Sequence, residues 1–425
     1  TLDGVRSAPG VVAVLTAADI PGANDISPTH RHDEPIFPTE FVNFHAQPLF
    51  AVVATTRDLA RRAARLARVA YEDLPHATDV AAARAGEAGF VTDPLTLSRG
   101  DLEASLAASP RRLQGGMALG GQEHFYLEGQ IALAIPGEDD EVLVYSSTQH
   151  PSETQHMIAA ALGVATHAVT VEIRRMGGAF GGKESQANLT AVVAALAARK
   201  LNRAVKLRLD RDEDMAATGK RHDFVIDYDV GFDDDGAIRA ADFVYAARCG
   251  FSSDLSGPVT DRALFHCDNA YFYPAVRARS EPWRTHTVSN TAFRGFGGPQ
   301  GMVGAERVIE EVAYATGLDP LDVRKTNAYS AGRDVTPYHQ RVEDDLGLHV
   351  MEALETRCDY RARRAAIRAF NATSPVVKRG IALTPVKFGI SFTATHFNQA
   401  GALVHVYRDG SVLLNHGGTE MGQGL

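Results

Sequence analysis

The chain has 425 residues, of which 45% are hydrophobic and 22% are charged, and these are ordinary values for a globular protein. Its length is more than one hydrophobic core organises, so several domains are expected. The formal net charge of −9 argues against nucleic acid or an anionic membrane as a partner.

The cysteines and the apolar runs exclude further classes of protein. Cys249, Cys267 and Cys358 lie far apart with no C-x-x-C pair, so they predict neither a disulfide framework nor an iron–sulfur or zinc site. This usage is typical of a reducing cytoplasm, where we expect the protein. No run of about 18 apolar residues is present, so no membrane-spanning helix is expected. The chain starts without Met and stops at Leu425 inside a glycine-rich stretch, so we expect a fragment of a longer polypeptide.

Residues 1–85 predict a small α/β unit. The short apolar runs 11–15 and 49–54 are typical of buried strands. A helix is expected to begin at a cap near Thr56 and to keep its apolar residues on one face as far as Tyr71.

Two segments are predicted to lack regular structure. The loop 30–34 (His-Arg-His-Asp-Glu) contains metal-ligating residue types, but no helix or strand register brings them together. A solvated loop is therefore favoured over a metal site. Residues 78–115 are rich in Ala, Gly, Arg and Ser, and they predict a linker over 86–115.

A second unit is predicted from Gly116. Its patterns indicate a strand over 141–145 and then a helix over 153–162, opened by a capping box at Ser152 and Gln155 and closed by Gly163. Further along, apolar alternation over 226–232 and 237–245 around a turn at 233–236 predicts a hairpin.

The stretch Arg174–Ser185 carries four glycines between an alternating apolar run at 169–173 and an Ala-rich helix predicted at 187–201. A strand, a glycine loop and a helix in this order present backbone N–H groups to an anion. The residues Gly177–Lys183 fit the nucleotide-binding pattern G-x-x-x-x-G-K, which requires Ser or Thr next to hold Mg²⁺. Here the next residue is Glu184, a carboxylate with the same sign of charge as the phosphates, so the nucleotide interpretation fails.

The same construction occurs twice more. The loop 294–301 precedes a predicted helix over 302–317, and the loop 417–424 follows a predicted hairpin over 403–414. Three such loops, interleaved with polar side chains, indicate one large anionic cofactor held mostly by backbone groups. The polar side chains are Gln149, Arg294 and Gln423.

Six stretches in order along the chain resemble the molybdenum-cofactor part of the xanthine dehydrogenase/xanthine oxidase family. This resemblance implies an α+β fold, with an α/β-hammerhead domain over 1–85, a first molybdopterin-binding domain over 116–379 and the start of a second over 380–425. The stretches are Gly120–Glu128, Arg174–Glu184, Arg262–Asn269, Phe293–Gly301, Lys387–Thr393 and Gly417–Leu425.

The resemblance implies hydroxylation of hypoxanthine and xanthine to urate with water as the oxygen source. Electrons would leave through 2Fe-2S clusters and FAD to NAD, and the chain has no sequence pattern for these centres. They are therefore expected on a partner subunit or another part of the polypeptide, and the molybdenum part is expected to dimerise. The family's catalytic base would lie beyond residue 425, so we expect no turnover by the fragment alone.

The resemblance also implies a set of site residues. Molybdenum would be held by the pterin dithiolene, with no metal ligand from the protein. Glu184 and Arg262 would be catalytic, and they would bind a purine together with Phe296, Phe392, Thr393 and Leu255. The cofactor would be surrounded by Gln149, Phe180, Gly181, Arg294, Met421, Gly422 and Gln423.

Glu184 and Arg262 favour a purine over an aldehyde, because aldehyde oxidases of similar sequence usually lack this pair and a polar site discriminates against substrates without partner groups. Carbon monoxide dehydrogenases carry a cysteine in the loop that here reads 292–298. Pro258 replaces a small polar residue of some relatives and leaves the substrate orientation open. The alternatives are an aldehyde oxidase-type hydroxylase, a non-catalytic partner-binding or phosphate-binding fragment, and a purely structural ion pair of Glu184 with Arg262.

Overall fold

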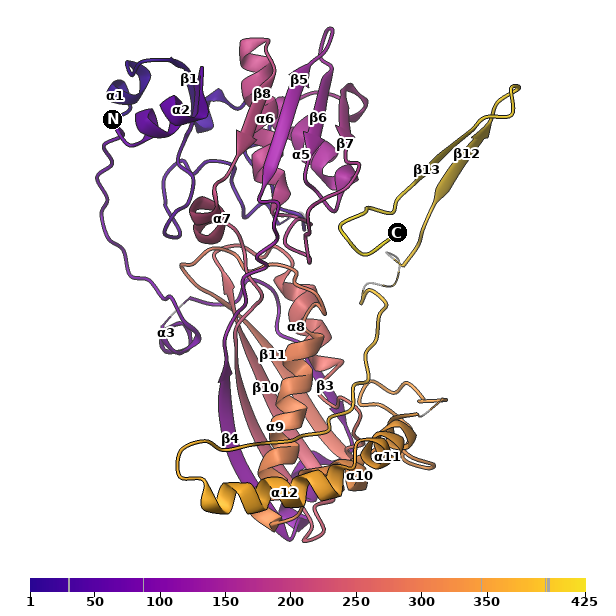
Figure 1. The fold of residues 1–425 in the computed structure, drawn as a ribbon. Coiled ribbons are helices and arrows are strands. Elements are labelled where there is room, and N and C mark those ends of the chain that lie inside the picture. The colour runs from indigo at the N-terminus through magenta and orange to yellow at the C-terminus, as the bar shows by residue number, and fades with distance from the viewer. Residues whose placement is uncertain (30, 87, 345, 394, 396–397) are drawn as a thin grey trace.

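The computed structural model describes residues 1–29, 31–86, 88–344, 346–393, 395 and 398–425. It has the predicted α+β architecture, with two main sheets and helices packed on each. In Figure 1 the four-stranded sheet lies in the upper half of the molecule and the five-stranded sheet in the lower half. The N-terminal unit lies beside the upper sheet.

The N-terminal unit is an antiparallel pair of strands packed with two helices. Thr56 caps the second helix by accepting a hydrogen bond from the N–H of Leu59 at 3.3 Å, as the sequence predicts. Val5, Val14 and Ala63 are buried between these elements. The elements are α1 (Asp3–Arg6), β1 (Val11–Leu15), β2 (Ala51–Ala54) and α2 (Arg57–Ala64).

Helix α2 ends at Ala64, and its predicted extension to Tyr71 is wrong. The backbone N–H of Arg68 donates to the carbonyl of Thr1 at 3.1 Å, and the terminal ammonium of Thr1 donates back to the carbonyl of Arg68 at 2.5 Å. These bonds use the backbone groups that a longer helix would need. Tyr71 is 62% exposed, so a longer helix would have no apolar surface to pack on. Residues 67–78 instead form an irregular, mostly exposed strap.

The upper sheet has the strand order β7-β6-β5-β8, with β6 and β7 parallel and the other pairs antiparallel. Its Ala-rich helix spans the predicted residues and is almost wholly buried against β5 and β8. The capping box at Ser152 is wrong, because Gln155 donates to the carbonyl of Val169 at 2.7 Å instead. The elements are β5 (Ile131–Pro136), β6 (Val142–Ser146), α5 (Pro151–Leu162), β7 (Val169–Glu172), α6 (Ala187–Leu201) and β8 (Val205–Arg208).

The lower sheet has the order β3-β11-β10-β9-β4, and its edge strands come from the segment predicted as a linker. The interpretation of residues 86–115 as a linker is therefore wrong. β3 pairs with β11, and β4 pairs with β9 along its whole length. The elements of this half are α3 (Val80–Ala85), β3 (Thr96–Arg99), α4 (Leu102–Ala108), β4 (Arg111–Leu119), β9 (Phe224–Phe232), β10 (Ile238–Gly250), α8 (Ser256–Leu264), β11 (Ala275–Arg284) and α9 (Gly298–Thr316), while α7 (Arg211–Ala217) lies below β8 in Figure 1.

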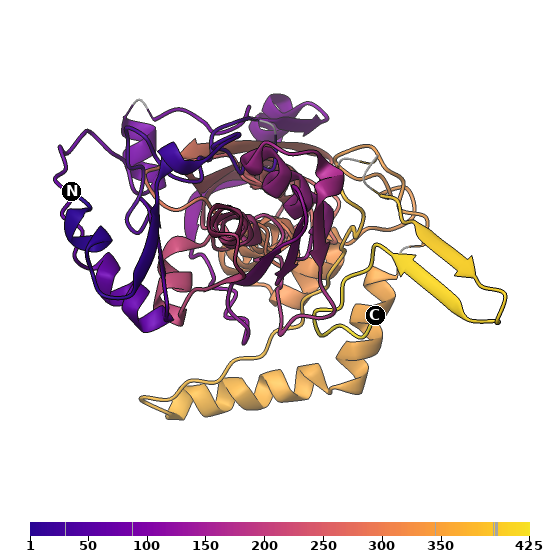
Figure 2. The same ribbon diagram turned by 90° about the horizontal axis from the view of Figure 1, so that it is seen from above.

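The C-terminal quarter adds three helices and a hairpin. Figures 1 and 2 show the hairpin, in yellow, projecting away from the two sheets. Every residue of its two strands is exposed. Among the described residues, no helix has the length and apolar character needed to cross a membrane. The elements are α10 (Pro320–Asn327), α11 (Gly347–Arg357), α12 (Tyr360–Thr373), β12 (Ala402–Val406) and β13 (Val412–His416).

Candidate functional site

The first glycine loop lies between β7 and α6 and is hydrogen-bonded to Gln149, three residues after the end of β6. The side-chain oxygen of Gln149 accepts hydrogen bonds from the N–H groups of Gly181 at 2.9 Å and Lys183 at 3.3 Å. The backbone N–H of Gln149 donates to the carbonyl of Lys183 at 2.8 Å. One glutamine, predicted as a cofactor residue, therefore fixes the shape of this loop.

The lysine of the first loop is not available to a phosphate. Lys183 is fully buried, and its ammonium donates to the hydroxyl of Ser147 at 2.6 Å and lies 4.6 Å from the ring centre of Tyr126. A nucleotide-binding lysine has to reach the ligand. The nucleotide interpretation thus fails at Lys183 as well as at Glu184.

The second glycine loop packs directly on the first. The N–H of Arg294 donates to the carbonyl of Phe180 at 2.9 Å, and a Cβ added to Gly181 would lie 2.7 Å from the carbonyl oxygen of Ala292. Phe180 and Phe296 both have left-handed backbones, with φ of +57° and +50°. Bulky residues rarely adopt this conformation, and such strain concentrates at functional sites.

The third glycine loop joins the other two at the same point. The N–H of Met176 donates to the carbonyl of Glu420 at 2.9 Å, and the hydroxyl of Thr419 donates to the carbonyl of Gln149 at 3.3 Å. Inside this loop the side chain of Gln423 accepts from the N–H of Met421 at 2.7 Å. The structure therefore brings the predicted cofactor residues of all three loops together around Gln149.

The donors at this junction suit a ligand with anionic oxygen atoms. Among the described residues, the side-chain nitrogen of Gln149 has no acceptor and the guanidinium of Arg294 donates no hydrogen bond. Arg294 is exposed, so its charge is available to a ligand. Neutral amides and a free guanidinium are groups that bind phosphate and oxo oxygens. These residues fit an anionic, pterin-sized cofactor.

Glu184 lies at the end of the first loop, two residues before the helix cap. Its side chain is half-buried, and no hydrogen bond or ion pair within the described ranges holds its carboxylate. Burial, and then the charge of Asp254, raises the pKa of Glu184 to about 7 against the opposing effect of His150. A carboxyl group with such a pKa can serve as a donor or an acceptor near neutral pH.

Arg262 lies on α8 and is 5% exposed. Its guanidinium donates to the carbonyl of Gly389 at 2.6 Å and to that of Ser391, which fixes the chain just before Phe392. Its Nε atom is buried without an acceptor in the described part of the chain, and burial lowers the pKa of Arg262. The Nε–H group of Arg262 is therefore a hydrogen-bond donor without a partner among the described residues.

The two predicted substrate aromatics are in contact beside Arg262. The ring centres of Phe296 and Phe392 are 5.5 Å apart with planes inclined at 48°, and the guanidinium carbon of Arg262 is 5.8 Å from the ring centre of Phe296. A Cβ added to Gly297 would lie 2.0 Å from the carbonyl oxygen of Val259 on α8, so the second loop is pressed against this helix.

The structure contains no ion pair between Glu184 and Arg262 among its described residues. Their segments are joined instead by Asp254, a residue that sequence reasoning missed. Asp254 accepts hydrogen bonds from Ser185 and Gln186, each at 2.7 Å, and Leu255, the residue after it, is the N-cap of α8. The polar run before α8 was the only signal, and it did not reveal these distant partners.

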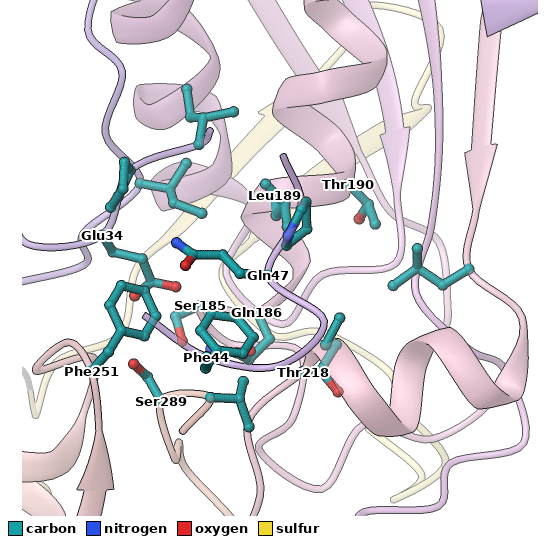
Figure 3. A pocket seen from close by; sticks show the side chains of 17 residues that line it. Glu34, Phe44, Gln47, Ser185, Gln186, Leu189, Thr190, Thr218, Phe251 and Ser289 are labelled. Atoms are coloured by element: carbon teal, nitrogen blue, oxygen red, sulfur yellow. The ribbon is translucent and has the colours of Figure 1, made fainter. Parts of the chain in front are cut away.

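A small cavity of about 70 Å³ lies beside this connection. Figure 3 shows Glu34 and Gln47, from the N-terminal unit, around it with Ser185 and Gln186. The hydroxyl of Ser252 donates to Glu34 at 2.9 Å. The prediction of a solvated loop is therefore wrong for Glu34, while His30 of that loop lies outside the described residues.

Known protein families match three parts of the chain. Residues 2–75 match the family described as aldehyde oxidase and xanthine dehydrogenase, a/b hammerhead domain. Residues 86–328 and 353–425 match two families, each described as a molybdopterin cofactor-binding domain. The domain limits predicted from the sequence remain predictions.

Curated relatives are similar over almost the whole chain. A xanthine dehydrogenase of Dictyostelium discoideum is 43% identical over 418 residues, which are 98% of this chain and 31% of that protein. A xanthine dehydrogenase/oxidase of Gallus gallus is 44% identical over 421 residues, which are 99% of this chain and 31% of that protein. The chain thus spans about a third of the length of these relatives.

Solved structures share the fold. The aldehyde oxidoreductase of Desulfovibrio gigas superposes with a TM-score of 0.82 at 24% identity, over 97% of this chain and 46% of that one. The aldehyde oxidoreductase of Desulfovibrio desulfuricans has a TM-score of 0.85 at 23% identity, over 97% of this chain and 47% of that one. At these identities the likeness establishes the architecture.

Proposed function

The chain belongs to the molybdopterin cofactor-binding family, and from this membership we propose that it is the molybdenum-bearing part of a xanthine dehydrogenase. The parent protein oxidises hypoxanthine and xanthine to urate, with water as the oxygen donor. The observation that carries this proposal is the group formed by Arg262, Phe296 and Phe392 beside the three joined glycine loops. The similarity to xanthine dehydrogenases over nearly the whole chain supports it.

The cofactor occupies the junction of the glycine loops. When bound, the molybdenum–pterin group supplies oxygen transfer from water and accepts the electrons. No protein side chain is a metal ligand in this proposal, since the pterin dithiolene holds the metal. The residues that surround the group are Gln149, Phe180, Gly181, Arg294, Met421, Gly422 and Gln423.

The purine lies between Phe296 and Phe392, whose ring centres are 5.5 Å apart, so the two rings must part to admit it. Aromatic contacts of this kind contribute about 0.5–1.5 kcal/mol each beyond area burial. Thr393, the residue after Phe392, and Leu255, the N-cap residue of the helix that carries Arg262, complete the pocket.

The charged residues Arg262 and Glu184 suit the addition of oxygen to an electron-poor purine ring. Arg262 stabilises the negative charge that develops on the purine, and burial strengthens this interaction by excluding water. Glu184 binds the nitrogen and oxygen edge of the ring, where a carboxyl group with a pKa of about 7 can donate or accept. The base that activates water is not assigned to any residue of this chain and belongs to another part of the parent protein.

Electrons leave through 2Fe-2S clusters and FAD to NAD, and these centres belong to another part of the polypeptide or to a partner subunit. The molybdenum part dimerises in the assembled enzyme, and the assembly works in the cytoplasm. These partners follow from the family membership and are part of the proposal.

The test uses the full-length parent protein. We expect molybdenum by metal analysis, a fluorescent pterin after oxidation, and turnover of xanthine with NAD that exceeds turnover of a simple aromatic aldehyde. Absence of both molybdenum and pterin would end the hydroxylase proposal. Turnover of the aldehyde without turnover of xanthine would assign an aldehyde oxidase instead.

A further inference from the structure

Asp254 connects the segment that carries Glu184 to the helix that carries Arg262. It is 1% exposed, and its two carboxylate oxygens accept from the hydroxyl of Ser185 and from the side-chain nitrogen of Gln186, each at 2.7 Å. Ser185 and Gln186 directly follow Glu184. Asp254 lies two residues before α8, so the residue that is bound to Ser185 and Gln186 is also close in sequence to the start of the helix of Arg262.

Gln186 extends the connection in a second direction. Its side-chain oxygen accepts from the N–H of Gly219 at 2.7 Å while its nitrogen donates to Asp254. Every polar atom of this amide group therefore has a defined role, and its orientation is fixed by donor and acceptor chemistry. Replacing the acid by an amide at Asp254, or the amide by an acid at Gln186, therefore removes the hydrogen bond between these two side chains.

The loop of Asp254 is itself held from the other side. The N–H of Ser253 donates to Asp33 at 2.8 Å, and the hydroxyl of Ser252 donates to Glu34 at 2.9 Å. These bonds join the loop to the N-terminal unit, next to the cavity in Figure 3. Asp254 and its loop are thus held from two sides, by the 185–186 segment and by the N-terminal unit, which restricts the movement of Asp254.

Several charged groups face the two carboxyl groups. Glu184 is surrounded by Asp254, by His150 at the start of α5 and by Glu153 within it. Asp254 faces Glu153, and it contributes to the raised pKa of Glu34 across the cavity wall. Burial raises the pKa of Asp254 to about 7, against the effect of its hydrogen bonds. A change of charge at Asp254 is therefore felt at Glu184.

We propose that Asp254 is a positioning residue, which sets the place and the protonation of Glu184 relative to Arg262. This inference rests on the proposed purine site, and it assigns to Asp254 no contact with the substrate. It concerns a connection within the chain, so it can be tested separately from the identity of the substrate.

Asp254→Asn in the full-length enzyme keeps the acceptor for Ser185 but sets an amide nitrogen against the nitrogen of Gln186. We expect kcat/KM for xanthine to fall about 10- to 100-fold and the affinity for urate, the product, to weaken similarly, since a misplacement of about 1 Å can cost about 10²-fold. Loss of the negative neighbour lowers the pKa of Glu184. The limb of the pH profile that Glu184 controls therefore moves to lower pH by about one unit.

The exchange can be reversed by a second substitution. Gln186→Glu keeps one oxygen for Gly219 and sets the other against Asp254, so alone it places two carboxylates together. Combined with Asp254→Asn, it restores the hydrogen bond with donor and acceptor exchanged, and the total charge of the pair is that of the native protein. We expect the double variant to recover most of the urate affinity and the original pH profile.

Asp229→Asn is the matched control, because Asp229 accepts from the side-chain nitrogen of Gln114 at 2.7 Å on the lower sheet, away from the site. It should leave both readouts unchanged. The inference would be overturned if Asp254→Asn had the pH profile and the urate affinity of the native enzyme. It would also be overturned if the double variant bound urate no more tightly than the weaker-binding single variant. If the native parent does not turn over purines, the proposed function is wrong. The positioning role of Asp254 would then be tested by comparing the pH dependence of turnover of another substrate in the native enzyme and in Asp254→Asn.

Discussion

At the scale of single residues, the site depends on a carboxyl group that no hydrogen bond or ion pair among the described residues holds. Glu184 is half-buried, has no hydrogen bond to its carboxylate in the described part of the chain, and has a pKa of about 7. A partly buried carboxyl group without a hydrogen-bond partner costs free energy, and this cost favours a functional role for Glu184. Arg262, by contrast, is anchored to two backbone carbonyls and shapes the pocket as well as charging it.

Glu184→Ala should separate purine from aldehyde substrates. The purine loses the partner of its polar edge, whereas a simple aromatic aldehyde has no such edge. We expect kcat/KM for xanthine to fall by about 10²-fold or more and that for the aldehyde to change by less than about fivefold. Steady-state kinetics of the full-length enzyme with both substrates measure this. Equal losses would favour the aldehyde oxidase alternative.

At the scale of elements, the glycine loops work as one unit because they are packed against each other. Gly181→Ala should therefore reduce the cofactor content, since its Cβ would lie 2.7 Å from the carbonyl oxygen of Ala292 and its φ is +96°. Metal analysis of the purified parent measures the content. Gly317→Ala is the control, because its φ of +74° is also left-handed but a Cβ added there has no atom within 4 Å. Equal molybdenum in both variants would contradict the role given to the loop contact.

The hairpin β12–β13 presents an apolar surface to solvent. Val406 is 73% exposed and lies on a two-stranded sheet whose outer edges are unpaired among the described residues. Such edges promote association between chains. We expect the 425-residue chain, expressed by itself, to self-associate, and Val406→Lys to reduce this association. Light scattering measures it, and Val376→Lys, at an 85% exposed valine outside any strand, should have no such effect.

Elements with strong local signals were predictable from the sequence. Helix α6 has an unbroken Ala-rich pattern, and the hairpin at 402–416 has an Asp-Gly turn between alternating strands. The strands β3 and β4 were missed because they are edge strands with little apolar alternation, and they form only by pairing with β11 and β9, far away in sequence.

Some parts of the candidate site could be predicted from the sequence and others could not. The glycine loops and their polar residues are local patterns, and their convergence on one cofactor was inferred from the recurrence of the same loop at three places, while the family resemblance supplied the identity of that cofactor. Asp254 and Glu34 could not be found, because their importance arises from burial and from partners in other parts of the chain. No pattern in a single sequence reports which carboxyl groups end up desolvated side by side.

At the scale of the whole molecule, these buried acids make stability depend on pH. Burial raises the pKa of Glu34, Asp254 and Glu184 in the folded state. A raised pKa gives stability that is complete below the unfolded value of 4.5 for a glutamate and is lost as the pH rises through the folded value, about 7 for Glu184. The folded protein should therefore be less stable in mildly alkaline than in mildly acidic solution.

Glu34→Gln should weaken this dependence, because an amide has the volume of the acid without its charge. We expect the difference in Tm between about pH 6 and about pH 8.5 to shrink by about 2–4 °C relative to the native protein. Thermal unfolding at the two pH values measures it. Glu138→Gln, at an exposed glutamate on the upper sheet, should leave the difference intact, and an unchanged difference in Glu34→Gln would refute the assignment.

The exposed strap at residues 67–78 determines where a protease would cleave the folded chain. A protease would find an accessible target there, since Leu74 is 50% exposed and the backbone is irregular. The severed N-terminal piece would nevertheless stay attached, because Gly22 and Ala23 donate backbone bonds to α5 and Asp33 and Glu34 are bound to the loop beyond β10. A nicked preparation would run as two bands under denaturing conditions and still elute as a single particle.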